Sequence, residues 1–138
     1  MIVVLDTNVL VSGLLRPHSK PAAILRLVVT GALRVAYDQR ILAEYRDVLG
    51  RPAFPFSAEQ ARALLEQLEA DGMAVAAGPL NDRLPDSDDE AFLEVALAAR
   101  ADVLVTGNTR HYPTRARQGV IVLDPAAFLE HWTRRRRG

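Results

Sequence analysis

The sequence predicts an α/β protein with a central parallel sheet of about four or five strands and helices on both faces. Apolar segments of strand length alternate with amphipathic segments of helix length along the chain. The first of them, 2–5, has no polar alternation, which is typical of a strand buried on both faces. The 138 residues contain no linker or repeat, so we expect one domain.

Five segments are expected to form strands, because each is short and apolar and ends at polar or turn residues. They are Ile2–Leu5, Leu33–Tyr37, Met73–Ala76, Val103–Thr106 and Val120–Leu123. Helical segments separate these strands, so right-handed crossovers between parallel strands are expected.

The intervening segments have helical periodicity, and first-turn prolines and terminal glycines support several of their boundaries. They are Asn8–Leu14, Pro21–Thr30, Gln39–Leu49, Ala58–Ala70, Asp88–Arg100 and, roughly, Pro125–Thr133. Residues 77–86 contain glycine and prolines and are expected to form a loop. We assign residues 1–133 to the domain and 134–138 to a basic, disordered tail.

Composition excludes several classes of protein. There is no cysteine, hence no disulfide framework or thiolate metal site, and the formal net charge is zero. All basic residues except Lys20 are arginines, which a GC-rich genome explains as well as phosphate binding does. No apolar run approaches about 18 residues and the N-terminus lacks a basic signal-peptide region, so we expect a cytoplasmic protein with no membrane association.

Asp6 is the first candidate functional residue. It follows the buried strand 2–5 directly, at the carboxyl end where open α/β sheets place their ligands. A buried carboxylate is costly unless a positive group pairs with it, and no Lys or Arg is near in the sequence. The alternative is that Asp6 only caps the helix that follows.

Glu44 lies at the margin of the apolar stripe of helix 39–49, where a side chain can face a cleft rather than bulk water. The alternative is a surface glutamate paired with Arg40, four residues earlier on the same helix. Periodicity alone favours this alternative slightly.

Asp89 gives a sharper signal. In a helix that buries Phe92 and Leu93, Asp89 falls in the middle of the apolar face, with Asp88 at its margin. Ser87 and Glu90 have the spacing of a capping box, which would start the helix here. Acids in a first turn complement the helix dipole, but that does not explain one directed at the core.

The strand 103–106 ends in polar residues, as the strand before Asp6 does. Thr106 and Asn108 are therefore expected beside Asp6 at the same edge of the sheet, with Asn8 in support. The alternative is an ordinary turn, since Thr, Gly and Asn are common turn residues. His111 follows in a polar loop, where a lone histidine is more often structural than a ligand.

Three carboxylates at one sheet edge cannot all stay ionised without a cation. Oxygen ligands favour Mg²⁺ or Mn²⁺, and such a site serves phosphodiester hydrolysis. No P-loop, dinucleotide fingerprint or Ser-His-Asp arrangement competes. A phosphoacceptor receiver domain is disfavoured because the only lysine is Lys20, whereas a small-molecule phosphatase stays open.

Four motifs in this order and spacing make the chain similar to the PIN-domain family over essentially its whole length. They are residues 4–10 (VLDTNVL), 41–49 (ILAEYRDVL), 86–96 (DSDDEAFLEVA) and 101–108 (ADVLVTGN). The likeness is greatest to the small bacterial VapC-like toxins of type II toxin–antitoxin systems.

The resemblance implies a three-layer α/β/α PIN-like fold with an Mg²⁺ or Mn²⁺ site that cleaves single-stranded RNA. It further implies a homodimer and a cognate antitoxin protein as partner. The catalytic and metal-binding acids of the family map to Asp6, Glu44 and Asp89, although Asp88 or Asp86 would replace Asp89 if the register shifted.

The position of the fourth family acid is a departure, because Asn108 stands there and removes one negative charge. The small PIN proteins that the chain resembles often carry Asn at this position, followed by a His-aromatic-Pro sequence like residues 111–113. An amide can still bind a cation or position water. The departure motivates an alternative, in which the chain is a PIN-fold RNA- or protein-binding module with weak or no nuclease activity.

Overall fold

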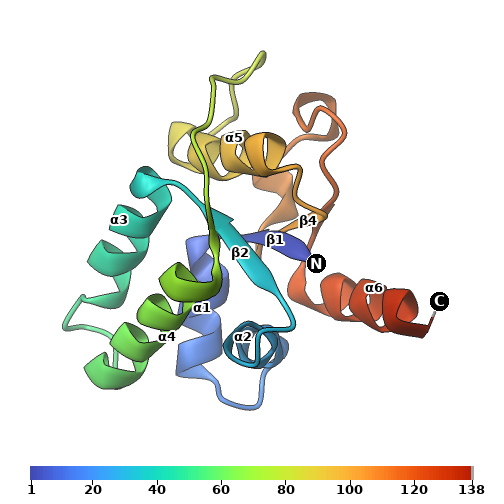
Figure 1. Cartoon of the computed structure of the whole chain (residues 1–138). Helices are drawn as coiled ribbons and strands as arrows, with labels where there is room; N and C mark the ends of the chain where they lie inside the picture. Colours follow the sequence, from blue (N-terminus) through green and yellow to red (C-terminus); the bar gives the residue numbers. More distant parts are fainter. Residues whose placement is uncertain (138) are drawn as a thin grey trace.

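The computed structural model describes residues 1–137 and contains one five-stranded parallel sheet (Figure 1). The strands are β1 (Ile2–Leu5), β2 (Arg34–Tyr37), β3 (Met73–Ala74), β4 (Val103–Val105) and β5 (Val122–Leu123). Their order in the sheet is β3-β2-β1-β4-β5, and every pairing is parallel. This confirms the predicted α/β class with a central parallel sheet.

Helices cover the sheet on both faces. They are α1 (Thr7–Leu15), α2 (Lys20–Val29), α3 (Gln39–Leu49), α4 (Ala58–Asp71), α5 (Glu90–Ala99) and α6 (Pro125–Arg137). Helix α5 packs on one face against β1, β2 and β4, while α1, α2 and α4 lie on the other (Figure 1). Helix α3 follows β2 and contacts α1 and α4 as well as α5, so it connects the two helical layers.

The central strands explain the apolar runs in the sequence. Strand β1 lies between β2 and β4, and the side chains of Val3–Leu5 and Val103–Val105 are fully buried. The register pairs Val3 with Val103 and Leu5 with Val105. The next residues, Asp6 and Thr106, therefore leave the sheet side by side at its carboxyl edge.

Polar caps begin several helices. The side chain of Ser19 accepts a hydrogen bond from a backbone N–H in the first turn of α2, that of Asp38 does so for α3, and that of Ser57 for α4. Asp6 occupies the same position before α1, but its carboxylate accepts no bond from that helix. The interpretation of Asp6 as a helix cap is therefore wrong.

The start of α5 differs from the prediction. Residues Ser87–Asp89 form a 3₁₀ turn and α5 begins at Glu90. No capping box joins Ser87 to Glu90, because Glu90 Oε2 instead accepts bonds from the Leu84 N–H at 3.0 Å and the Arg83 Nε at 2.9 Å. The turn is capped by Asp86, which accepts from the Asp88 N–H at 2.9 Å. Glu90, which the sequence assigned to the helix cap, therefore bonds to the preceding loop instead.

Helix α6 is longer than predicted and continues through Arg137, so residues 134–137 are helical rather than irregular. Arg135 lies 3.2 Å from Asp102, and the guanidinium of Arg136 lies 5.7 Å from the centre of the Trp132 ring. Gly138, the last residue of the expected tail, lies outside the described residues. Between residues 1 and 137, none of the helices has the length and apolar character needed to cross a membrane.

Candidate active site at the carboxyl edge of the sheet

Asp6 is fixed at the carboxyl end of β1. Only 6% of the residue is exposed, and its backbone N–H continues the sheet by donating to the Val105 carbonyl at 2.9 Å. Its Oδ2 atom accepts two hydrogen bonds, from the Thr106 hydroxyl at 2.9 Å and from the Tyr112 hydroxyl at 3.1 Å. Two neutral donors thus hold a carboxylate that no side-chain cation pairs with in the described structure.

The two residues after Asp6 connect β1 to other elements. The hydroxyl of Thr7, a buried residue, donates to Glu44 Oε2 on α3. The side chain of Asn8 accepts a bond from the Gly107 N–H at 2.9 Å. A Cβ at Gly107 would lie only 3.2 Å from that Asn8 oxygen, so the close approach favours glycine. Residues 6–8 therefore assemble the site from β1, α3 and the loop after β4.

Glu44 is half-buried on α3 and does not pair with Arg40, so that alternative is wrong. Arg40 instead lies 2.7 Å from both Asp38 and Glu94. Burial raises the pKa of Glu44, the hydrogen bond from Thr7 opposes this, and the negative charges of Asp6 and Asp88 raise it further.

Asp89 is buried at the end of the 3₁₀ turn, as its place on the apolar face predicted. Burial, followed by the charge of Asp6, raises its pKa to about 6, while His111 opposes the rise. His111 Nδ1 lies 3.0 Å from the buried Asp89 Oδ2 and, when the ring is protonated, forms an ion pair with it. No other hydrogen-bond donor of the described residues reaches that oxygen.

The side-chain amide of Asn108 contacts the ring of His111. Its Nδ2 lies 2.9 Å from His111 Nε2, while its backbone N–H donates to the Thr106 hydroxyl oxygen at 3.1 Å. If Nε2 accepts from the amide, the ring proton is on Nδ1, which faces Asp89. Asn108 therefore reaches Asp89 through the imidazole ring.

Asp88 and Asp86 lie on the surface beside the buried Asp89. Asp88 is exposed and lines a cleft of about 280 Å³ between α3 and α5, together with Glu44, Arg40 and Glu94. Asp86 is exposed and caps the 3₁₀ turn, which explains an acid there without a functional role. Of the three acids at 86, 88 and 89, only Asp89 is buried.

Three residues in this arrangement were not predicted to belong to the site: Thr7, His111 and Tyr112. Thr7 stands just before the predicted helix 8–14, His111 was expected to be a loop residue, and Tyr112 was noted only as the aromatic of the His-aromatic-Pro sequence. The signals for the last two were their place shortly after Thr106 and the His-aromatic-Pro sequence that they share with the small PIN proteins. No periodicity could show that their side chains turn back toward Asp6 and Asp89.

We call Asp6, Glu44 and Asp89 the acidic centre, and its chemistry fits a divalent cation. All donors are oxygens, burial and the charge of Asp6 raise the pKa of the other two carboxyls, and the only polar neighbour of the buried Asp89 Oδ2 among the described residues is the His111 ring. In residues 1–137, however, no three Asp, Glu, His or Cys side chains are close enough together to hold one ion. Binding would therefore require side chains of the acidic centre to move inward.

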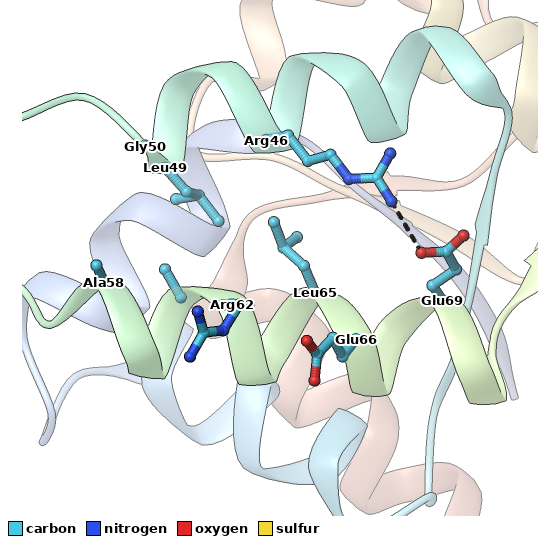
Figure 2. Close-up of a pocket in the computed structure, with 9 residues that line it drawn as sticks. Arg46, Leu49, Gly50, Ala58, Arg62, Leu65, Glu66 and Glu69 are labelled. Atoms are coloured by element: carbon cyan, nitrogen blue, oxygen red, sulfur yellow. Dashed lines mark hydrogen bonds and ion pairs between the residues drawn. The ribbon is translucent and has the colours of Figure 1, made fainter.

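A separate cavity of about 340 Å³ lies between α3 and α4 (Figure 2). The Arg46–Glu69 ion pair, at 3.0 Å, bridges the two helices at one side, and Leu49 and Leu65 face each other between them. No member of the acidic centre lines this cavity. It is therefore a different feature from the cleft beside Glu44.

Comparisons with known proteins agree with the fold. A family model described as PIN domain matches residues 2–110. The crystal structure of VapBC2 from Rickettsia felis, bound to a DNA fragment from its promoter, is similar with a TM-score of 0.63 and 20% identity, over 90% of this chain and 98% of that chain. A solved protein from Pyrobaculum aerophilum has a TM-score of 0.54 and 15% identity, over 94% of this chain and 87% of that one. A search of curated proteins gave no match. At these identities the two structural likenesses concern the fold alone.

Proposed function

The chain belongs to the PIN domain family, and on that premise we propose that it is an Mg²⁺- or Mn²⁺-dependent endoribonuclease acting on single-stranded RNA. One observation carries the proposal. The fold brings Asp6, Glu44 and Asp89 from three separate segments to one edge of the sheet, where burial and mutual repulsion raise the pKa of Glu44 and Asp89. A group of acids with no Arg or Lys among them suits a site that takes a cation from solution.

The acidic centre would hold the cation in this proposal. When bound, a divalent ion lowers the pKa of water and neutralises charge that develops on a phosphodiester. Thr106 holds Asp6 and Thr7 holds Glu44 by the hydrogen bonds described above. The cleft beside Asp88 is lined by one member of the acidic centre, Glu44, and is where an RNA strand would approach it.

Asn108, at the fourth acid's position, has an indirect role in this proposal. It holds the ring of His111, which in turn lies against Asp89. The chain then keeps three ionisable ligands, and the fourth position orients one of them through His111.

We further propose that the protein is a cytoplasmic toxin of a toxin–antitoxin pair, that it forms a homodimer and that a cognate antitoxin protein inhibits it. The fold likeness to VapBC2 supports this. Induced expression should arrest growth, and co-expression of a small protein encoded by a neighbouring gene should relieve the arrest. Harmless expression of folded, active enzyme would contradict the toxin role and leave a housekeeping nuclease.

A PIN-fold binding module with weak or no nuclease activity is the second candidate. It is favoured by the neutral Asn108 and by the spacing of the acids, which do not form a ready ligand set in residues 1–137. The module would bind RNA or a protein with or without Mn²⁺ and would release no cleavage products.

The deciding experiment measures cleavage of a labelled single-stranded RNA with Mn²⁺, Mg²⁺ or EDTA. Asp6→Asn should abolish metal-dependent cleavage, because it removes one charge of the acidic centre. Asp38→Asn is the matched control, since Asp38 also follows a strand and precedes a helix but caps α3. Equal RNA loss with wild type and Asp6→Asn would indicate a contaminating nuclease and remove the proposal's support.

A further inference from the structure

Tyr112 differs from the other two tyrosines in what its hydroxyl contacts. All three tyrosines are buried. The hydroxyl of Tyr37 donates to the Glu69 carbonyl and that of Tyr45 to the Leu5 carbonyl, which are backbone groups. The hydroxyl of Tyr112 donates to the Asp6 carboxylate at 3.1 Å. A fully buried ring thus ends in a donor directed at an acid of the proposed metal site.

Both hydrogen bonds to the Asp6 carboxylate end on the same oxygen. Thr106 and Tyr112 donate to Oδ2, and no hydrogen bond from residues 1–137 ends on Oδ1. The last torsion of an aspartate is soft, so the plane of a carboxylate is set by its hydrogen bonds rather than by a rotamer well. Two donors on one oxygen fix that plane and leave the other oxygen available.

The donors are neutral, which matters for a site that takes a cation. An arginine or lysine in the same place would satisfy Asp6 but would repel a divalent ion. Hydroxyl groups satisfy the buried oxygen and leave the negative charge in place. Burial, and then the charges of Asp6 and Asp89, raise the pKa of Tyr112, so its hydroxyl stays protonated as a donor.

The segment that carries Tyr112 is itself clamped. Arg117 Nε donates to the Tyr112 carbonyl at 2.7 Å, and the Arg117 Nη2 donates to the Thr109 carbonyl at 3.5 Å. The Tyr112 N–H donates to the Thr109 carbonyl at 3.1 Å. The same turn places His111 against Asp89, so one short segment touches two members of the acidic centre.

We infer that Tyr112 is a positioning residue, whose hydroxyl shares Asp6 Oδ2 with Thr106 and so presents Oδ1 to a divalent cation. This rests on the proposed metal site and deepens it, since it assigns separate tasks to the two carboxylate oxygens. Groups that orient metal ligands in this way typically change metal affinity or activity by about 10-fold to 100-fold when removed.

The test removes only the hydroxyl, by Tyr112→Phe, and compares it with Tyr37→Phe. The control also deletes a buried tyrosine hydroxyl, but one that bonds to the Glu69 carbonyl on α4. Mn²⁺ affinity is measured by calorimetry, and RNA cleavage is resolved into kcat and KM. We expect Tyr112→Phe to weaken Mn²⁺ binding about 10-fold or more and to lower kcat with KM unchanged, while Tyr37→Phe retains wild-type values.

The outcomes separate this inference from the proposed function. If the wild type binds Mn²⁺ but cleaves no RNA, the nuclease proposal fails, and weaker Mn²⁺ binding by Tyr112→Phe still supports the inference. Equal Mn²⁺ affinity of wild type and Tyr112→Phe overturns the inference, even when RNA is cleaved. Equal weakening by Tyr37→Phe overturns it too, because a general loss of stability then explains the effect. A wild type that binds no Mn²⁺ overturns both.

Discussion

Two groups of acidic side chains lie along α3 and α5, and they differ in their charge balance. In the first, which we call the Arg40 cluster, the guanidinium of Arg40 lies 2.7 Å from Asp38 at the start of α3 and 2.7 Å from Glu94 on α5. In the second, the acidic centre, Glu44 on α3 and Asp89 before α5 are near enough to Asp6 for its charge to raise their pKa, and none of the three pairs with an arginine or lysine in the described structure.

The pKa shifts show the consequence of this difference. Hydrogen bonds from Arg40 to Asp38 and Glu94 raise the pKa of Arg40, because the cation and its acids stabilise one another. In the acidic centre burial and like charge raise the pKa of Glu44 and Asp89, which means that their ionised forms are disfavoured. Arg40 thus neutralises its acids within the fold, whereas the acidic centre has only the His111 ring, beside Asp89, as a potential cation among the described residues.

Of the three variants that test this difference, Asp89→Asn should have the largest effect, both on RNA cleavage and on stability. Metal-dependent RNA cleavage should fall about 1,000-fold, as expected when a ligand charge is removed from a catalytic metal site. The metal-free protein should nevertheless become more stable at pH 8, on the order of 2 kcal/mol, because an ionised carboxylate is disfavoured there. Chemical denaturation with EDTA measures the second effect.

The sign of this stability change depends on pH. The folded-state pKa of Asp89, about 6, lies above its ordinary value of 3.8, so the group costs stability as pH rises from about 4 to 6 and costs the full amount above that. The advantage of Asp89→Asn should therefore vanish near pH 3.5. An advantage that persists there would show that packing, not charge, is responsible.

Asn108→Asp should supply the fourth acid that this chain lacks and so increase the negative charge of the site. The new carboxylate lies beside His111 and adds negative charge near Asp89. We expect Mn²⁺ affinity to rise about 10-fold, about 1.4 kcal/mol in binding free energy. Titration calorimetry of wild type and Asn108→Asp measures this, and unchanged affinity would show that position 108 does not sense the ion.

Asp38→Ala should have the smallest effect and should act on stability alone. The Asp38 carboxylate accepts from the Ile41 N–H at 3.0 Å, and loss of such a cap costs about 1 kcal/mol of unfolding free energy. Cleavage rate and Mn²⁺ affinity should match wild type. A variant that unfolds at the expected lower denaturant concentration but also loses Mn²⁺ binding would show that the two groups of acids are one functional unit.

Much of the fold could be predicted because its signals are local. Buried strands such as β1 and β4 are apolar on both faces, and helices such as α3 carry a stripe that repeats every turn. Boundaries were less certain where competing partners exist. Glu90 suits a capping box by spacing, yet it bonds to the N–H of Leu84 in the preceding loop, so α5 begins later than expected.

The candidate site was predictable only in part. Asp6 follows an all-apolar strand and Asp89 lies on an apolar helical face, so both stood out by burial, and both are buried. Glu44 was ambiguous because periodicity gives its angle on the helix but not its partner, which is Thr7 rather than Arg40. Tyr112 stood out only as the aromatic of the His-aromatic-Pro sequence after Asn108, and that pattern does not show which group its hydroxyl contacts.

The sequence by itself determined that Asp6 and Asp89 would be buried, since burial follows from the pattern of apolar residues along each segment. It did not determine how they are paired. Asp6 and Asp38 both follow a strand and precede a helix, yet one accepts hydroxyls from Thr106 and Tyr112 while the other caps α3 and binds Arg40. Only the tertiary structure decided this, because the partners of Asp6 are about a hundred residues away in sequence and meet it through the parallel register of β1 with β4.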